Sequence, residues 1–259
     1  MKTKTIKCNF KNSRGHTLAA RLDIPAALDI DKVEETSFII FCHCFTCTKE
    51  TITTFRLSRL LAEHGHAVLR FDFTGLGDSE GVFSSTTFST TQDDLHSAIN
   101  FLKNHYQEPE FLMGHSLGGT TALSIANEYK NIRGVVTVAS PSEPSHVLHH
   151  FGHALTLLEQ NIPASFEVAG QYYDLDPGFV EDVRNIDMQA SLSALEKPLL
   201  VFNIENDALV DASNAQEIQQ WTNGDVTLID ITGSNHLLTN KGAVEMVAGD
   251  IVEWMNSID

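Results

Sequence analysis

The sequence contains few basic residues for its length. Its 259 residues include 17 Lys and Arg against 34 Asp and Glu, which gives a formal net charge of −17 at pH 7. Nucleic-acid-binding proteins usually present a basic face, so this balance argues against a nucleic-acid partner and against docking on anionic membranes. Long apolar runs are also missing. The run from Phe38 to Cys42 is far too short to span a bilayer, so we expect no membrane segment.

Cysteine is scarce as well. Three of the four cysteines, Cys42, Cys44 and Cys47, fall within six positions. Such close neighbours are poor candidates for a structural disulfide framework, so we expect a reducing, cytoplasmic location. The basic N-terminus lacks the apolar stretch of a signal peptide, which agrees with that location. No repeat, low-complexity tract or linker interrupts the chain, so we expect one domain over residues 1–259.

The sequence does contain a regular alternation of apolar strands with amphipathic helices. Strands that are apolar throughout, separated by such helices, indicate a mostly parallel sheet with helices on both faces, which is an α/β fold. The expected strands are Thr5–Phe10, Leu18–Ile24, Ser37–Cys42, Ala67–Phe71, Glu110–Met113, Gly134–Ala139, Pro198–Asn203 and Val226–Ile231, with helices at Thr51–His64, Thr90–His105, Leu117–Tyr129, Ala212–Trp221 and Ala243–Met255 and a polar loop at Ala26–Glu35.

The alternation is interrupted between about residues 142 and 191. This stretch predicts a helix at His146–Gln160, a hairpin formed by Ser165–Val168 and Tyr172–Leu175, and a short helix at Phe179–Arg184. An insertion with its own small elements, late in an α/β sheet, is expected to form a cap over the active site. A peripheral decoration is the alternative.

The most informative motif is Gly114–Gly118, which reads G-x-S-x-G and directly follows an apolar, strand-like run. A sharp strand-to-helix turn at this place would expose the Oγ of Ser116, and the flanking glycines would let neighbouring backbone pass closely. A Gly/Ser surface turn is the alternative, because short motifs also occur by chance. A serine hydroxyl is a weak nucleophile, so it needs a base, and the base needs a group that fixes its tautomer.

Two residues later in the chain can supply these partners. In the α/β-hydrolase arrangement the acid follows a late strand and the histidine follows the last strand. Asp207 and His236 occupy these places. We therefore assign Ser116 as nucleophile, His236 as general base and then acid, and Asp207 as the orienting carboxylate. Glu205 and Asp211 are the competitors for the acid, and Asp211 is more typical of a helix N-cap.

The same mechanism requires an oxyanion hole with two backbone N–H groups aimed at the developing negative charge. One is expected from Leu117, the residue after the nucleophile. The other is expected from Phe45, in the loop that follows a buried strand. We also expect His43 and Cys44 of that loop, and His115 beside the serine, to contact the substrate.

These motifs resemble those of the α/β-hydrolases, in particular the serine-esterase and serine-aminopeptidase branch. That branch commonly shows H-G-F-x-G in the oxyanion loop, D-x-x-G-x-G-x-S after the next strand, G-x-S-x-G, a late G-x-x-D and a terminal G-x-x-H. The corresponding segments here are, in the same order, His43–Cys47, Asp72–Ser79, Gly114–Gly118, Asn203–Asp207 and Gly233–His236. Two segments depart from the family pattern: Cys44 and Cys47 stand where the family tends to have Gly, and the segment that ends at Asp207 lacks its Gly. We expect Asp72–Ser79 to be a structural turn beside the site.

Narrower resemblances are also present. His43–Cys47 together with Phe71–Gly77 resembles the hydrolase half of bacterial proteins that fuse an α/β-hydrolase to an OsmC-like peroxide-reducing domain. The chain ends at Asp259, so we expect that second domain to be absent. The predicted hairpin, with Phe179–Asp182, resembles the cap of small bacterial cinnamoyl and feruloyl esterases.

The triad and the resemblance together imply a serine hydrolase, a carboxylesterase on small esters that works through an acyl-enzyme intermediate. Amide, thioester and feruloyl-ester substrates stay open, because the triad does not choose among acyl donors. The expected partner is a small-molecule ester, and no cofactor or metal is implied. Assembly as a monomer or as a homodimer is left open.

Two other interpretations use residues outside the triad. A non-hydrolytic module would use the Cys44/Cys47 loop for thiol-dependent redox chemistry, peroxide defence or binding. A metal-binding protein would use the cysteines or the histidines at positions 146–153, although buried packing and a polar helix face are the expected roles of these residues.

Overall fold

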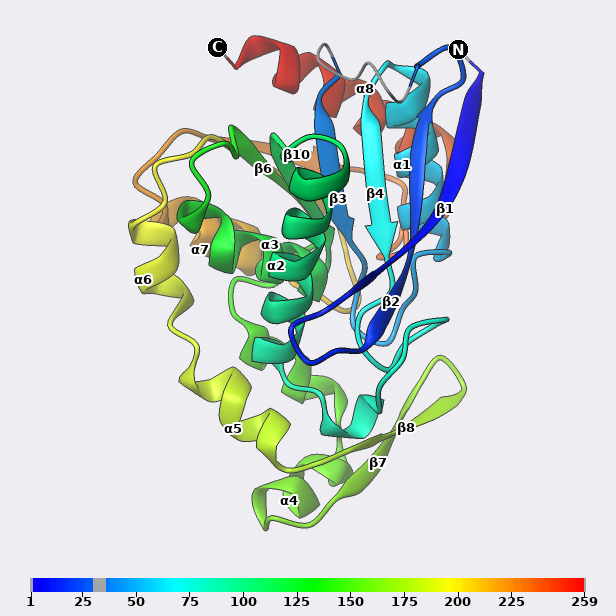
Figure 1. Cartoon of the computed structure of the whole chain (residues 1–259). Coiled ribbons are helices and arrows are strands. Elements are labelled where there is room, and N and C mark those ends of the chain that lie inside the picture. Colours follow the sequence, from blue (N-terminus) through cyan, green and yellow to red (C-terminus); the bar gives the residue numbers. More distant parts are fainter. Residues whose placement is uncertain (1, 30–35, 259) are drawn as a thin grey trace.

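The computed structural model describes residues 2–29 and 36–258, with one large sheet at its centre (Figure 1). The sheet strands are β1 (Thr3–Lys11), β2 (Thr17–Pro25), β3 (Phe38–Cys42), β4 (Ala67–Phe71), β5 (Phe111–His115), β6 (Gly134–Val138), β9 (Leu199–Ile204) and β10 (Val226–Ile231). Their order across the sheet is β1-β2-β4-β3-β5-β6-β9-β10. β2 pairs antiparallel with β1 and β4, and the remaining neighbours are parallel. The predicted mostly parallel sheet is confirmed.

Helices cover both faces of this sheet, as predicted. α1 (Ile52–Glu63) and α8 (Lys241–Ser257) contact each other on one face. α2 (Phe88–His105), α3 (Leu117–Ile125), α6 (Met188–Ser193) and α7 (Ser213–Trp221) pack on the other face. The central strands are buried throughout, which is why their sequences do not alternate between apolar and polar residues.

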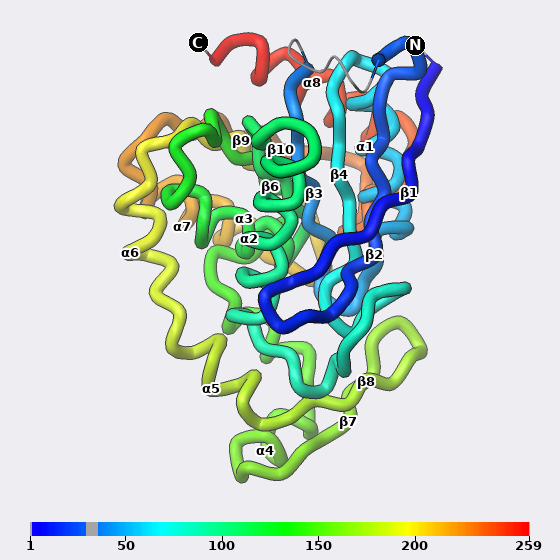
Figure 2. Tube along the Cα trace, viewed as in Figure 1, coloured from blue at the N-terminus to red at the C-terminus, as the bar shows by residue number. Residues whose placement is uncertain are grey.

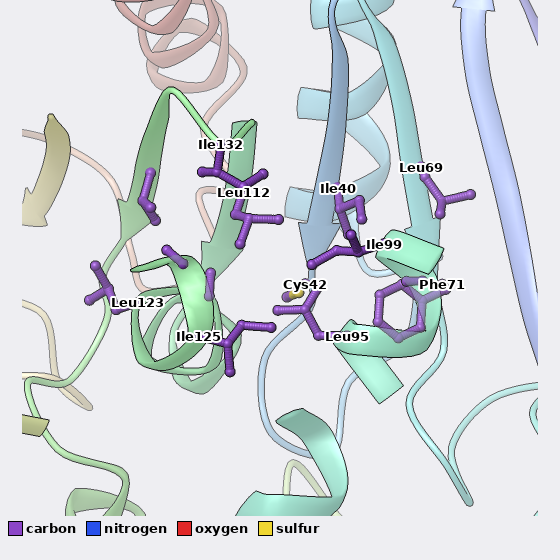
Figure 3. Close-up of a cluster of buried hydrophobic side chains, with 14 of the residues drawn as sticks. Ile40, Cys42, Leu69, Phe71, Leu95, Ile99, Leu112, Leu123, Ile125 and Ile132 are labelled. Atoms are coloured by element: carbon purple, nitrogen blue, oxygen red, sulfur yellow. The ribbon is translucent and has the colours of Figure 1, made fainter. Parts of the chain in front are cut away.

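Alternate residues of one strand supply two separate cores. Ile40 and Cys42 of β3 point into the cluster that includes Leu95 and Ile99 of α2 (Figure 3). Their neighbours Ile39 and Phe41 pack instead with the α1 and α8 side chains. This follows from strand geometry, since successive side chains point to opposite faces of the sheet.

Between β6 and β9 the chain leaves the sheet, and we call residues 142–191 the insertion. It contains the 3-10 helix η3 (Pro144–His150), α4 (His153–Glu159), the hairpin β7 (Ala164–Val168) and β8 (Gln171–Leu175), α5 (Gly178–Asn185) and the first residues of α6. Figure 2 shows α4 and the hairpin at the end of the molecule toward which β3 and β4 run. Ligands of α/β proteins bind at this carboxyl edge of the sheet.

Most predicted elements differ from the observed ones only at their ends, but the insertion differs more. The single helix expected at His146–Gln160 is two helices, η3 and α4. Gly152 separates them with φ +52°, a left-handed conformation that ends helical pairing. The short helices α6 and η1 (Phe83–Ser85) were not predicted. The expected loop at Ala26–Glu35 lies partly outside the described residues.

Within the described ranges, no helix combines the length and the apolar character that a membrane crossing requires.

Candidate active site

Ser116 lies at a sharp turn between β5 and α3. Its backbone has φ +52° and ψ −130°, a strained conformation that non-glycine residues seldom adopt. Its N–H donates to the carbonyl oxygen of Val138, 2.9 Å away on the neighbouring strand. The turn therefore lifts the serine side chain away from the sheet at the carboxyl end of β5, as the G-x-S-x-G motif predicts.

The glycines of this motif are required by close backbone contacts. A Cβ atom on Gly114 would lie 2.3 Å from the carbonyl carbon of Gly118. A Cβ atom on Gly118 would lie 2.4 Å from the carbonyl oxygens of Cys42 and His43. Any side chain at either position would push α3 away from β5 or from the end of β3. The two glycines thus set the distance between the serine and the loop that follows β3.

His236 and Asp207 meet beside this turn. His236 Nδ1 and Asp207 Oδ2 are 2.7 Å apart, and their side chains are only 10% and 1% exposed. Asp207 Oδ1 accepts hydrogen bonds from the N–H groups of Leu209, at 2.8 Å, and Val210, at 3.2 Å. Burial alone would raise the pKa of Asp207, but the hydrogen bond from His236 and these N–H groups outweigh it and lower the pKa. The carboxylate therefore stays charged and fixes the imidazole.

The two competing carboxylates have other surroundings. Glu205 is exposed. Asp211 accepts the N–H of Ser213 at 2.9 Å at the start of α7, and this hydrogen bond lowers the pKa of its carboxyl group. Asp211 thus contacts the first residue of α7, although the N-cap of this helix is Ala212 and not Asp211 as expected. Of the three candidates, only Asp207 contacts the histidine.

Ser116 and His236 both line a cavity of about 690 Å³ at the base of the insertion. This volume is within the range of small-molecule sites. Leu117, Phe45 and Cys44 also line it. Sequence reasoning missed the residues that the insertion contributes, because their placement depends on how the insertion packs. They are His146, Val147, His150, Phe151, Phe166, Glu167, Val168, Ala169, Gln171 and Tyr173.

The cavity has an aromatic wall and a polar wall. The ring of Phe45 stacks on Phe166 with 5.8 Å between centroids, and Phe151 lies 4.5 Å from Phe166. On the polar wall, half-buried His146 lies near the Asp207 loop, and burial lowers the pKa of its imidazole. The aromatic wall therefore suits an apolar group of a ligand. The polar wall presents the imidazole of His146, whose lowered pKa favours its neutral form.

The two residues expected to supply oxyanion donors, Leu117 and Phe45, both line the cavity with Ser116. Leu117 is the first residue of α3, where helical N–H groups have no partner within the helix. The N–H of Phe45 has no hydrogen-bond acceptor among the residues that the structure describes. Their role as oxyanion donors stays a prediction.

We call residues 43–49, which follow β3, the Phe45 loop. This loop contains a disulfide between Cys44 and Cys47, which corrects the expectation drawn from cysteine usage. The Cα atoms are 5.2 Å apart, within disulfide range, because residues 44–47 form a tight turn closed by the Cys47 N–H and the Cys44 carbonyl at 3.1 Å. The bridge closes one small loop and does not link distant parts of the chain. The positive φ in this loop falls on Thr46, at +58°, and not on either cysteine.

His43 is buried beneath the loop and does not line the cavity. Its Nδ1–H donates to the Cys44 carbonyl at 2.8 Å, and its Nε2 accepts the N–H of Phe73 at 3.2 Å. Burial lowers its pKa to about 4, so the ring is neutral near pH 7. Both ring nitrogens thus contact backbone, which places His43 as a support of the Phe45 loop.

His115 is also fully buried and absent from the cavity wall. Its Nε2–H donates to the His236 carbonyl at 2.7 Å, and burial lowers its pKa to about 3. Of the three expected substrate contacts, only Cys44 reaches the cavity. His115 instead holds the backbone of the proposed catalytic base.

A buried ion pair supports the other end of the Phe45 loop. Lys49 Nζ lies 2.5 Å from Asp72 Oδ2, and the Lys49 N–H donates to Asp72 Oδ1 at 2.6 Å. Gly77 must be glycine here, because a Cβ atom would lie 2.2 Å from the Asp72 carboxylate. The sequence analysis interpreted this D-x-x-G-x-G segment as a structural turn but did not find Lys49 as its partner.

In the part of the chain that the structure describes, no three His, Cys, Asp or Glu side chains are placed to hold a metal ion together. The ring of His146 contacts those of His149 and His150, with centroids 5.2 Å and 5.8 Å away.

Comparison with known proteins agrees with this fold. Over its full length the chain is similar to the esterase domain of a Rhodothermus marinus protein, at 31% identity and a TM-score of 0.77, covering 100% of this chain and 99% of that one. Est1E from Butyrivibrio proteoclasticus, in a structure with ferulic acid bound, shares the fold at 22% identity, with a TM-score of 0.82 and coverage of 97% and 98%.

Sequence relatives include the human mitochondrial palmitoyl-protein thioesterase ABHD10. It is 23% identical over 210 residues, which cover 75% of this chain and 66% of the relative, so the chain spans just under two thirds of that protein's length. The family described as "Serine aminopeptidase, S33" matches residues 35–172, more than half of the chain. The chain therefore belongs to the serine aminopeptidase S33 family of α/β-hydrolases.

Proposed function

We propose that this protein is a serine hydrolase that cleaves esters or thioesters of small acyl groups through an acyl-enzyme intermediate. The observation that carries the proposal is the 2.7 Å contact between His236 Nδ1 and Asp207, in a histidine that shares one cavity wall with the elbow residue Ser116. A base oriented by a buried carboxylate, in one cavity with a half-buried serine, is the arrangement that acyl transfer requires.

Each residue then has a defined task. Ser116 Oγ attacks the acyl carbon and passes its proton to His236 Nε2, while Asp207 stabilises the resulting imidazolium. The N–H groups of Leu117 and Phe45 bind the oxyanion. His236 returns the proton to the leaving alcohol or thiol, and a water molecule repeats the sequence to release the acid.

The cavity favours an apolar acyl group. Phe45, Phe151 and Phe166 form one continuous aromatic wall next to the oxyanion donors. Two similar proteins support the same acyl preference, since one is a palmitoyl-protein thioesterase and the other was observed with ferulic acid. The contact between His236 and Asp207, in one cavity with Ser116, favours this function over a non-hydrolytic module. A cytoplasmic location, a single domain and the narrower likeness to OsmC-fused hydrolases stay predictions.

The test is hydrolysis of p-nitrophenyl esters and acyl thioesters over a series of acyl lengths, with feruloyl esters included. We expect Ser116→Ala to lower kcat by at least about 10³-fold. The matched control is Ser193→Ala, which removes an exposed serine hydroxyl on α6 and should leave kcat unchanged. Equal activity of wild type and Ser116→Ala would contradict the proposal.

A further inference from the structure

Phe45, the proposed oxyanion donor, lies inside a covalent ring. The disulfide joins the residue before Phe45 to the residue two positions after it. Cys44 and Cys47 both line the catalytic cavity, together with Phe45 and Ser116. The redox state of these two sulfurs therefore acts directly on the backbone that would hold the oxyanion.

This turn depends on the disulfide more than a glycine-containing loop would. Thr46, a β-branched residue, has φ +58°, a conformation that such residues adopt only under constraint. Hydrogen bonds also support the turn, from the Cys47 N–H to the Cys44 carbonyl at 3.1 Å, from the Thr46 hydroxyl to the Phe45 carbonyl at 2.7 Å and from the Tyr173 hydroxyl to the Thr46 carbonyl at 3.3 Å. Without the bridge, Thr46 is free to relax toward a negative φ.

The bridge can also be reached from the cavity. Cys44 is 5% exposed and Cys47 is more exposed, so the Cys47 sulfur is the one that an incoming thiolate meets. The free cysteines are poor competitors for exchange. Burial raises the pKa of Cys8 to about 11 and that of the fully buried Cys42 still further, which keeps both as thiols.

We propose that the Cys44–Cys47 disulfide is a reversible thiol-exchange site that takes a dithiol as its reductant, and that opening it lowers the hydrolase activity of the adjacent site. The second half of this inference rests on the proposed function, whereas the first half does not. In this proposal the Cys44–Cys47 disulfide regulates the hydrolase, whereas the redox interpretation of the sequence had these cysteines replace the triad as the functional site.

The exchange is balanced as follows. One thiolate of the dithiol attacks the Cys47 sulfur, the S–S bond breaks, and the Cys44 sulfur leaves as a thiolate that takes up a proton. The second thiolate of the reductant then attacks the reductant's first sulfur, which is bonded to Cys47 in the mixed disulfide. The Cys47 sulfur leaves as a thiolate and is protonated. Two electrons and two protons pass to the protein, and the reductant leaves as a disulfide.

Opening the ring should weaken the oxyanion site without abolishing it. The ring of Phe45 remains packed on Phe166 and Phe179, and Lys49 remains paired with Asp72. We therefore expect a fall in kcat of about tenfold, less than the loss of a whole oxyanion donor. KM should change little, because the cavity walls stay in place.

The experiment compares the oxidised and the dithiol-treated native protein. Free thiols are counted by alkylation and mass spectrometry without denaturant, and kcat and KM are measured on the same samples with one ester. We expect two additional alkylated thiols, at Cys44 and Cys47, a tenfold lower kcat, and recovery of both values on reoxidation. The double variant Cys44→Ser/Cys47→Ser should show the low kcat and no redox response, whereas Cys8→Ser should keep the full response.

Two results would overturn the proposal. One is a thiol count that does not rise in the native protein, and the other is an unchanged kcat after both thiols are free. Failure of the proposed function looks different. In that case esters are not hydrolysed in either redox state, while the thiol count still decides whether the disulfide is an exchange site.

Discussion

The loops on the two sides of Ser116 are held in place by different means. The loops that follow β9 and β10 are fixed by hydrogen bonds, from His236 to Asp207 and from His115 to the His236 carbonyl. The loop that follows β3 is fixed by a disulfide and a buried ion pair, Lys49 with Asp72. In the proposed mechanism, His236 gains and loses a proton as general base, so hydrogen bonds that adapt to either charge suit it. The proposed oxyanion donor, the N–H of Phe45, has only to stay in place, and stronger restraints suit it.

The largest effect should come from the hydrogen-bonded side. Replacing Asp207 with Asn keeps the volume but removes the charge and favours the wrong imidazole tautomer. We expect kcat for ester hydrolysis to fall about 10³- to 10⁴-fold with little change in KM. Asp211→Asn is the matched control and should retain activity within a factor of about two, because that carboxylate contacts Ser213 and not His236. Wild-type activity in Asp207→Asn would contradict the idea that the Asp207 carboxylate orients His236 for catalysis.

The second effect tests the restrained side through stability. Lys49→Met leaves the Asp72 carboxylate buried without its partner, which should lower the free energy of unfolding by about 3–5 kcal/mol. Urea denaturation measures this change. Lys241→Met, which breaks an exposed pair with Glu245 on α8, should cost less than about 1 kcal/mol. Similar costs for the two variants would show that the buried pair does not restrain the Phe45 loop.

A third prediction concerns pH and involves both sides. In the folded protein the pKa is lowered to about 4 for His43 and to about 3 for His115. Below pH 6.5 these imidazoles therefore become protonated in the unfolded chain while they are still neutral in the folded protein. The stabilisation is complete above the unfolded value of about 6.5 and is lost as the pH falls from there toward 4 and 3. We expect the free energy of unfolding to drop by a few kcal/mol, on the order of the combined shifts, between pH 6.5 and 4.

The pH titration has a matched pair of variants. Chemical denaturation at each pH should give a shallower slope for His43→Gln than for wild type. His153→Gln, at an exposed position, should give the wild-type slope. An unchanged slope in His43→Gln would separate the stability of the Phe45 loop from the neutrality of its histidine.

The smallest expected effect is a change in KM, and it tests what the polar wall of the cavity binds. His146 lies near the Asp207 loop, where His236 would protonate the leaving group. His146→Leu should raise KM by up to about tenfold for esters with a hydroxylated alcohol and leave KM for the matching alkyl esters unchanged, since one neutral hydrogen bond is lost. His149→Leu, outside the cavity, is the control. Equal changes for both ester series would assign His146 to packing.

Much of the hydrogen-bonded side was predictable from the sequence. The strands that carry Ser116, Asp207 and His236 are apolar runs whose order sets the chain topology, and parallel strands end at one edge of the sheet. The pattern also assigned the two proposed oxyanion donors to Phe45 and Leu117, which line the cavity with Ser116. Local sequence and topology were enough, because each of these positions is defined relative to a strand end.

The restrained side was less predictable, because its contacts depend on geometry that no local pattern encodes. Cys44 and Cys47 form a disulfide only once the turn brings their Cα atoms to 5.2 Å. His43 belongs to a polar loop motif, yet it faces the protein interior and not the substrate. The insertion was located by its break in the strand–helix alternation, but its cavity-lining residues depend on packing among distant aromatic rings.

The packing of Phe45 has a consequence for how this enzyme could change its substrates. Its ring belongs to the same aromatic cluster as Phe151, Phe166 and Phe179 of the insertion. A substitution that reshapes the cavity for a larger acyl group also disturbs the residue whose backbone would bind the oxyanion. Substrate range and turnover are therefore physically linked, and variants selected for new acyl groups should need a compensating change near residues 43–49 to regain their rate.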